Sequence, residues 1–111
     1  LGVLKRHRAD EFLISCNLDG FSLALDFRVR AHNRARLAAL AAELDEIVLR
    51  SGGRFYFAKD STLRSEATRA FLGQDTLARL IKLKRQCDPQ GLLQSNLSRR
   101  LLPELYTHIV V

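Results

Sequence analysis

The feature that most constrains the fold of this chain is a strict alternation of apolar and polar side chains over residues 21–30. Successive side chains of a β-strand point to opposite faces of the sheet, so a period of two predicts a strand with one apolar and one polar face. The apolar face holds Phe21, Leu23, Leu25, Phe27 and Val29. The other face holds Ser22, Ala24, Asp26, Arg28 and Arg30. The turn signal Asp19-Gly20 comes just before this strand, and residues 2–8 are predicted to form a shorter one.

The next segment predicts an amphipathic helix of about 17 residues. Asn33 is a favourable N-cap, and the glycines at 52–53 can end the helix. Apolar residues recur between them at helical spacing: Leu37, Leu40, Ala41, Leu44, Ile47 and Val48.

The remaining elements are shorter. Residues 54–58 predict a further, aromatic strand, and Ser61 or Thr62 can cap a short helix that ends near Gly73. Asp75 is expected to cap a last helix, which Asp88-Pro89 ends. Its predicted buried stripe is Leu77, Leu80, Ile81 and Leu83.

The predicted order β-β-α-β-α-α indicates an α+β fold, an antiparallel sheet with helices packed on one face. The 111 residues suffice for a single domain, 1–111, and 47% hydrophobic residues exclude a disordered chain. No apolar run approaches the roughly 20 residues that a membrane-spanning helix needs. The chain begins at Leu1 and contains no methionine, so we expect it to be a processed chain or a piece of a longer protein.

A net charge of +6 is concentrated in residues 54–101, which hold ten basic and four acidic side chains. Nucleic acid, a phosphorylated substrate and an anionic membrane surface are therefore candidate partners. A basic α+β module that binds nucleic acid or another protein is the alternative to an enzyme. His7, His32 and His108 have no ligand-like spacing with each other or with the two cysteines, so no metal site is predicted.

Two groups of residues could form a functional site. Tyr56 offers a phenol, and Lys59 places a cation just past the predicted strand 54–58. Because a spacing of three breaks strict alternation, the chain must bend after Ala58 for both side chains to reach one cleft. The small residues Ser22 and Ala24 share a face with Asp26, and this face either meets solvent or packs against another molecule or domain.

Two longer motifs carry a resemblance to a known family. They are Gly52-Gly53-Arg54-Phe55-Tyr56-Phe57-Ala58-Lys59-Asp60-Ser61 and the stretch from Asp88-Pro89-Gln90-Gly91 to Arg99-Arg100-Leu101. Over residues 3–101 the chain resembles the C-terminal end of FAD-linked oxidoreductases of the vanillyl-alcohol-oxidase superfamily. The likeness is greatest to the decaprenylphosphoryl-β-D-ribose 2′-oxidase and aldonolactone oxidase branch.

The resemblance implies a C-terminal cap, or substrate, domain with a ferredoxin-like half, covering a flavin held by a separate N-terminal FAD-binding domain of the same protein. Tyr56 and Lys59 would then be the catalytic and cofactor-binding pair beside FAD. The substrate-binding residues would be Lys5, His7, Ser22, Ala24 and Asp26. The reaction would be oxidation of the CH–OH group of a sugar or sugar-lipid by hydride transfer to the flavin. This chain alone is expected neither to hold FAD nor to be active, because it has no phosphate-cradling loop.

Three positions depart from the prenylphosphoryl-ribose pattern. Ser22 replaces an asparagine, Ala24 stands where some members have a cysteine, and His7 replaces an aromatic residue. A sugar alcohol, an aldonolactone and a polyprenyl-phosphate sugar therefore stay open as substrates. We expect a cytoplasmic protein that binds no nucleic acid, and contact with a membrane surface stays open.

Overall fold

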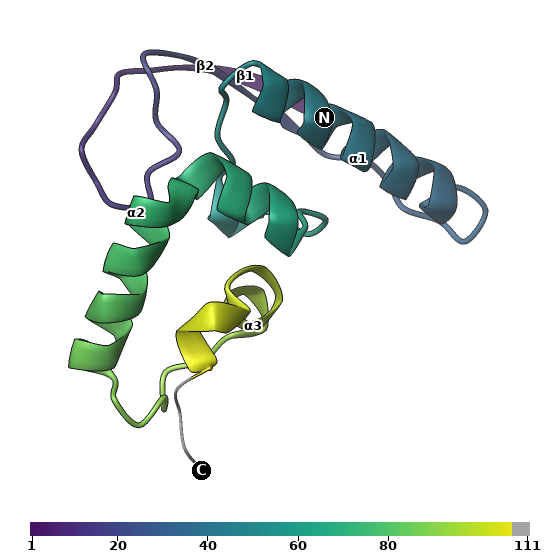
Figure 1. Ribbon diagram of the computed structural model, residues 1–111. Coiled ribbons are helices and arrows are strands. Elements are labelled where there is room, and N and C mark those ends of the chain that lie inside the picture. The colour runs from purple at the N-terminus through teal and green to yellow at the C-terminus, as the bar shows by residue number, and fades with distance from the viewer. Residues whose placement is uncertain (108–111) are drawn as a thin grey trace. The chain divides into compact units, whose positions relative to one another are not determined.

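The computed structural model describes residues 1–107, which divide into one unit over Leu1–Thr62 and a second that begins at Leu63 (Figure 1). His108, one of the three histidines of the chain, lies outside the described residues.

The first unit begins with a β-hairpin. Strand β1 (Gly2–His7) pairs antiparallel with β2 (Gly20–Leu25), in a register that sets Lys5 opposite Ser22. The pairing continues by one residue, because the Asp26 N–H donates to the Leu1 carbonyl at 2.8 Å and the Leu1 nitrogen donates to the Asp26 carbonyl at 3.1 Å. The two predicted strands are confirmed, although β2 ends at Leu25, five residues before the alternation does.

Helix α1 (Arg34–Arg50) has the predicted length of 17 residues and follows the predicted N-cap position, Asn33. The Asn33 side chain does not cap the helix. It accepts from the Arg30 N–H at 2.7 Å and donates to the Arg28 carbonyl at 3.0 Å, so it fastens the turn before the helix. Gly52 ends the helix with a φ of 68°, a conformation that glycine adopts without steric cost.

The predicted stripe of α1 is half-buried at four positions and exposed at two. The half-buried residues are Leu37, Ala41, Leu44 and Val48. Leu40 and Ile47 are exposed, since they lie at the margins of the stripe.

The prediction of a strand over residues 54–58 was wrong. The backbone is extended at Tyr56 and then forms a 3₁₀ turn, η1 (Phe57–Lys59), and strand pairing is confined to β1 and β2 among the described residues. Burial does alternate here, with Phe55 and Phe57 half-buried and their neighbours exposed. An alternation of apolar and polar side chains therefore indicates an extended segment with one covered side. It does not by itself require a neighbouring strand.

The second unit is helical. Helix α2 (Ser65–Cys87) contains a break at Gly73, where φ is 76° and ψ is 162°, so the two predicted helices are present as two segments. The first segment begins at Ser65 with Arg64 as N-cap, not at Ser61 or Thr62. Of the stripe predicted for the second segment, Leu83 is exposed.

Two short elements complete this unit: α3 (Asn96–Leu101) and the 3₁₀ helix η2 (Pro103–Tyr106). Ser95 caps α3 by accepting from the Ser98 N–H at 3.0 Å, while the Ser98 hydroxyl accepts from the Ser95 N–H. This reciprocal pair satisfies two backbone donors that the helix start would otherwise leave free.

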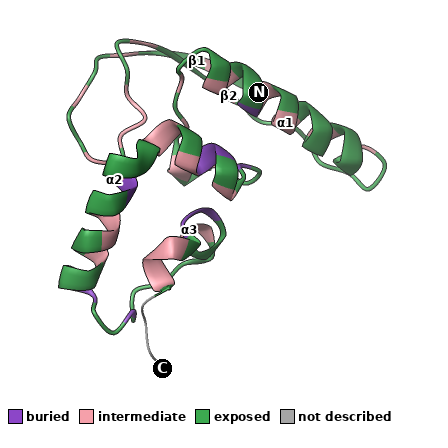
Figure 2. Ribbon diagram, in the orientation of Figure 1, coloured by how far each residue is buried: buried purple, intermediate pink, exposed green. Residues whose placement is uncertain are grey.

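The buried core of the described chain lies in the second unit (Figure 2). Across residues 1–107, the buried apolar side chains are Leu63, Ala67, Leu77, Leu101 and Leu102. The hairpin contributes none of them. The protein is thus an α+β fold, as predicted, with a helical core and a lightly covered hairpin. None of the helices within residues 1–107 is long and apolar enough to cross a membrane.

Candidate functional site

One face of the hairpin gathers most of the predicted site residues. Residues directly opposite each other in an antiparallel pair project to the same face. The register therefore places the following side chains together on what we call the site face: Val3, Lys5, His7, Ser22 and Ala24. Asp26 continues the same alternation beyond the end of β2, through its backbone pairing with Leu1.

A direct hydrogen bond joins two of these residues across the strands. His7 Nε2 lies 2.7 Å from Ser22 Oγ. His7 is paired with Gly20, which presents no side chain opposite the imidazole, and Ser22 is the diagonal neighbour. Diagonal pairs across an antiparallel ladder are within reach of a long side chain. The sequence alone did not reveal this contact, because it depends on the register.

The site face is the more covered of the two hairpin faces. Val3, His7 and Ala24 are half-buried, whereas Phe21 is 71% exposed and Leu23 is 62% exposed. Within the described residues, the apolar side chains of β2 are thus the more exposed ones. On the site face itself, Lys5 and Ser22 are exposed.

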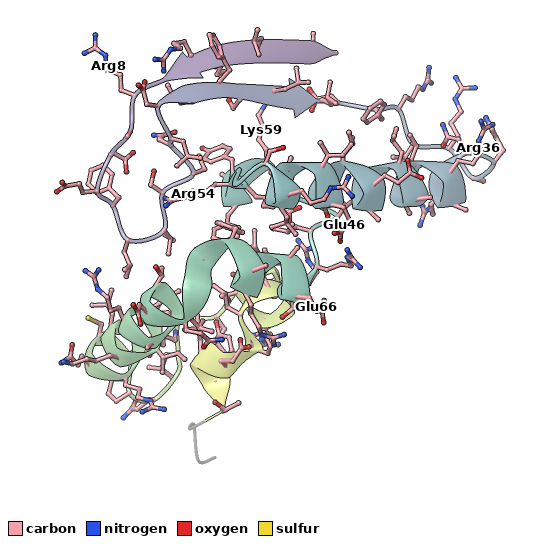
Figure 3. All side chains as sticks on the ribbon, turned by 45° about the horizontal axis from the view of Figure 1, so that its top comes forward. Arg8, Arg36, Glu46, Arg54, Lys59 and Glu66 are labelled. Atoms are coloured by element: carbon pink, nitrogen blue, oxygen red, sulfur yellow. The ribbon has the colours of Figure 1, made fainter. Side chains whose placement is uncertain are left out.

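Tyr56 directly precedes the η1 turn, and Lys59 is the last residue of the turn. The Lys59 N–H donates to the Tyr56 carbonyl at 3.3 Å, which closes the turn. The chain thus bends at residues 57–59, between the positions of Tyr56 and Lys59. Both are exposed, and Lys59 reaches from this turn toward the hairpin (Figure 3).

The loop between the two strands is held by a polar network centred on Asp10. One carboxylate oxygen accepts from the Phe12 N–H at 3.0 Å, and the other accepts from Ser15 Oγ and Asn17 Nδ2, each at 2.8 Å. The hydrogen bond from Ser15 is the main reason that the pKa of Asp10 is lowered from its ordinary value. Hydrogen bonds to a carboxylate stabilise its charged form.

Arg54 links this loop to the segment that carries Tyr56 and Lys59. Its guanidinium donates to the Ser15 carbonyl at 3.1 Å and its charge contributes to the lowered pKa of Asp10. Sequence reasoning missed this network. The run of Asp10, Ser15 and Asn17 in a loop was the available signal, because such side chains bond to nearby backbone groups in turns.

Several of the basic side chains of residues 54–101 form ion pairs or hydrogen bonds within the second unit. Lys84 Nζ lies 2.5 Å from the Asp88 carboxylate, and Arg69 pairs with Glu104. Arg100 donates to the Leu63 carbonyl at 2.5 Å. These cations hold the helices and their connecting loop together. Within residues 1–107, no group of three His, Cys, Asp or Glu side chains is placed to bind a metal ion.

The chain is similar to parts of longer proteins. It is 34% identical over 88 residues to a decaprenylphosphoryl-β-D-ribose oxidase of Mycolicibacterium smegmatis, a match that covers 79% of this chain and 18% of that protein. It is 38% identical over 82 residues to an uncharacterized protein in the mprA 5′ region of Streptomyces coelicolor, covering 74% of this chain and 21% of that one. The chain thus spans about a fifth of the length of these relatives. No protein-family profile matches it.

Proposed function

We propose that this chain is the substrate-covering domain of an FAD-dependent oxidoreductase that oxidises a sugar-like alcohol. The observation that supports the proposal best is the pairing of two features in one unit. A partly covered sheet face with small residues carries Lys5 and the bonded pair His7 and Ser22, and Lys59 projects toward the same hairpin. The similarity to one segment of a decaprenylphosphoryl-β-D-ribose oxidase adds independent support.

The exposed groups on the η1 turn fit a flavin. Lys59 offers a cation on a flexible stem that can approach the carbonyl edge of the ring system, where negative charge develops on reduction. Tyr56 is 60% exposed and presents a flat ring with a hydroxyl. When bound, FAD would supply the acceptor for the hydride that leaves the carbinol carbon. A separate FAD-binding domain of the same protein would hold it.

The residues of the hairpin would bind the substrate. Ala24 and Val3 leave room for a ring, while Lys5 and the His7–Ser22 pair offer a cation and hydrogen-bonding groups. Asp26, at the end of the face, would accept from a substrate hydroxyl. As the alcohol becomes a carbonyl, the hydride would pass to the flavin and the hydroxyl proton to solvent, and these contacts would keep the reacting C–H bond aimed at the flavin.

The test uses the whole protein that contains this chain. We expect a yellow preparation with a flavin absorbance spectrum, which a prenylphosphoryl-β-D-ribose, an aldonolactone or a sugar alcohol bleaches under anaerobic conditions. A colourless protein, or a flavin that none of the three compounds reduces, would contradict the proposal. Salt-dependent binding of mixed-sequence DNA or RNA by a colourless protein would favour the basic-module alternative.

A further inference from the structure

We infer that Arg54 is a positioning residue for Lys59: its hydrogen bond to the loop over residues 8–19 fixes where the η1 turn holds the lysine. The catalytic consequence rests on the proposed function, since the place of Lys59 affects the rate only if the lysine lies beside the flavin. The fixing itself is a property of the chain and can be measured without a substrate.

The loop holds the group to which Arg54 binds. Asp10 accepts from the Phe12 N–H at 3.0 Å and from the Ser15 hydroxyl and the Asn17 side-chain amide, each at 2.8 Å. The Ser15 hydroxyl accepts from the Asn17 N–H at 2.9 Å, and the Ser15 N–H donates to the Phe12 carbonyl at 3.2 Å. The Ser15 carbonyl, to which the Arg54 guanidinium donates at 3.1 Å, is therefore held by bonds on both sides of it (Figure 3).

The residue before Arg54 is also fixed. The Gly53 N–H donates to the Val48 carbonyl at 2.8 Å, and a Cβ on Gly53 would lie 2.7 Å from Val48 Cγ1, so the backbone is in close contact with the end of α1. The chain then runs extended through Tyr56, whose carbonyl accepts from the Lys59 N–H. With Gly53 bound to α1 and Arg54 bound to the loop, both the start and the direction of this short segment are set.

Lys59 depends on its backbone for its position. The side chain is exposed and flexible, so the η1 turn decides which region the ammonium can reach. A cation stabilises charge on a flavin best when it is already in place, and a misplacement of about 1 Å can cost roughly 100-fold in rate. We expect a smaller effect when Arg54 is lost, because Gly53 still holds the start of the segment.

The kinetic experiment measures flavin reduction by Arg54→Met and Asp10→Ala in the flavin-loaded whole protein. The probe is the prenylphosphoryl-β-D-ribose, aldonolactone or sugar alcohol that reduces the wild-type flavin. Both variants should lower the limiting rate about 5- to 10-fold with the substrate dissociation constant little changed, because Lys59 acts on charge that develops during the reaction. Arg50→Met removes an equal charge from the end of α1 and should leave the rate unchanged.

The opposite charges of Arg54 and Asp10 separate positioning from a direct electrostatic effect. If these charges acted on the flavin, removal of Asp10 would speed its reduction while removal of Arg54 slowed it. Positioning predicts that both substitutions slow it. In a Lys59→Ala background neither should slow reduction by more than about a further 2-fold, because both act through Lys59. Opposite effects, or effects that multiply with that of Lys59→Ala, would overturn the inference.

A measurement without substrate distinguishes failure of this inference from failure of the proposed function. In nuclear magnetic resonance spectra of the whole protein, the backbone amide signals of residues 57–59 should shift in Arg54→Met and in Asp10→Ala, and stay in place in Arg50→Met. Signals that stay in place in the first two variants would overturn the inference, whatever the kinetics show. If they shift but none of the three compounds reduces the wild-type flavin, the proposed function fails and the catalytic role of Arg54 fails with it.

Discussion

At the scale of single residues, Lys59 is the side chain whose role differs most between a catalytic and a surface interpretation. In the whole protein, Lys59→Ala should slow substrate-driven flavin reduction roughly 100- to 1000-fold, because removal of a preorganised charge typically costs about 3–4 kcal/mol. Stability should change by less than about 0.5 kcal/mol, as for other exposed positions. Anaerobic stopped-flow absorbance measures the rate, and the melting temperature tests the fold.

The matched control is Lys82→Ala, an exposed lysine of α2. It should leave reduction unchanged. If the Lys59→Ala variant retains its flavin and its flavin is reduced at the wild-type rate, Lys59 is a solvated surface residue with no catalytic role.

Asp88 provides a second residue-scale prediction, on pH. Its carboxylate accepts from Lys84 Nζ at 2.5 Å and from the Leu92 and Leu93 N–H groups at 2.8 and 2.9 Å. The hydrogen bond from Lys84 is the largest cause of its lowered pKa, below the ordinary 3.8. A lowered pKa in the folded state stabilises the fold above pH 3.8, and this contribution is lost as the pH falls through the folded-state value.

Asp88→Asn should therefore lower the melting temperature by several degrees at pH 7, and the difference from wild type should shrink as the pH falls below 3.8. Circular dichroism melts at a series of pH values measure it. Asp75→Asn, at an exposed position of α2, is the control. A difference that is constant with pH would show that the charge of Asp88 is not what stabilises this loop.

At the scale of elements, Gly73 decides the shape of α2. Its φ of 76° and ψ of 162° lie in a region that is essentially restricted to glycine. Gly73→Ala should therefore destabilise the fold by about 1–3 kcal/mol, even though an added Cβ would meet no atom within 4 Å. Urea denaturation measures the loss, with Gly20→Ala as control, since that position is equally open and its φ is not positive. If Gly73→Ala leaves the free energy of unfolding nearly unchanged, the two segments of α2 can merge into one helix.

Local patterns predicted some elements well and the site only in part. The alternation after Gly20 and the spacing between Asn33 and Gly52 predicted the second strand and α1, because each depends on side chains close in sequence. The His7–Ser22 contact could not be predicted in this way. It follows from the register of β1 on β2, and the twelve-residue connection over residues 8–19 does not fix a register by its turn type. The prediction of a strand over residues 54–58 was wrong for a related reason. An alternating pattern indicates an extended segment but does not specify the strand with which it pairs.

At the scale of the whole molecule, the apolar face of the hairpin is the most conspicuous exposed surface. Phe21, Leu23 and Leu25 are 71%, 62% and 42% exposed, on a two-stranded sheet that is marginal without cover. The isolated chain should bind the dye ANS, and the double variant Phe21→Ser/Leu23→Thr should reduce the fluorescence by about half or more. Leu92→Ser, at an exposed leucine in the second unit, is the control. Equal fluorescence from wild type and the double variant would show that this face is covered in solution.

The break at Gly73 also affects which insertions and deletions the second unit can accept. In a continuous helix, one added residue rotates everything beyond it by about 100°, which would turn a buried stripe toward solvent. Gly73 separates the segment that carries Ala67 and Thr68 from the segment that carries Leu77. A change in the length of one segment therefore need not alter the helical phase of the other. Variation in length near residue 73 should be tolerated in relatives of this chain, whereas variation within either segment should not.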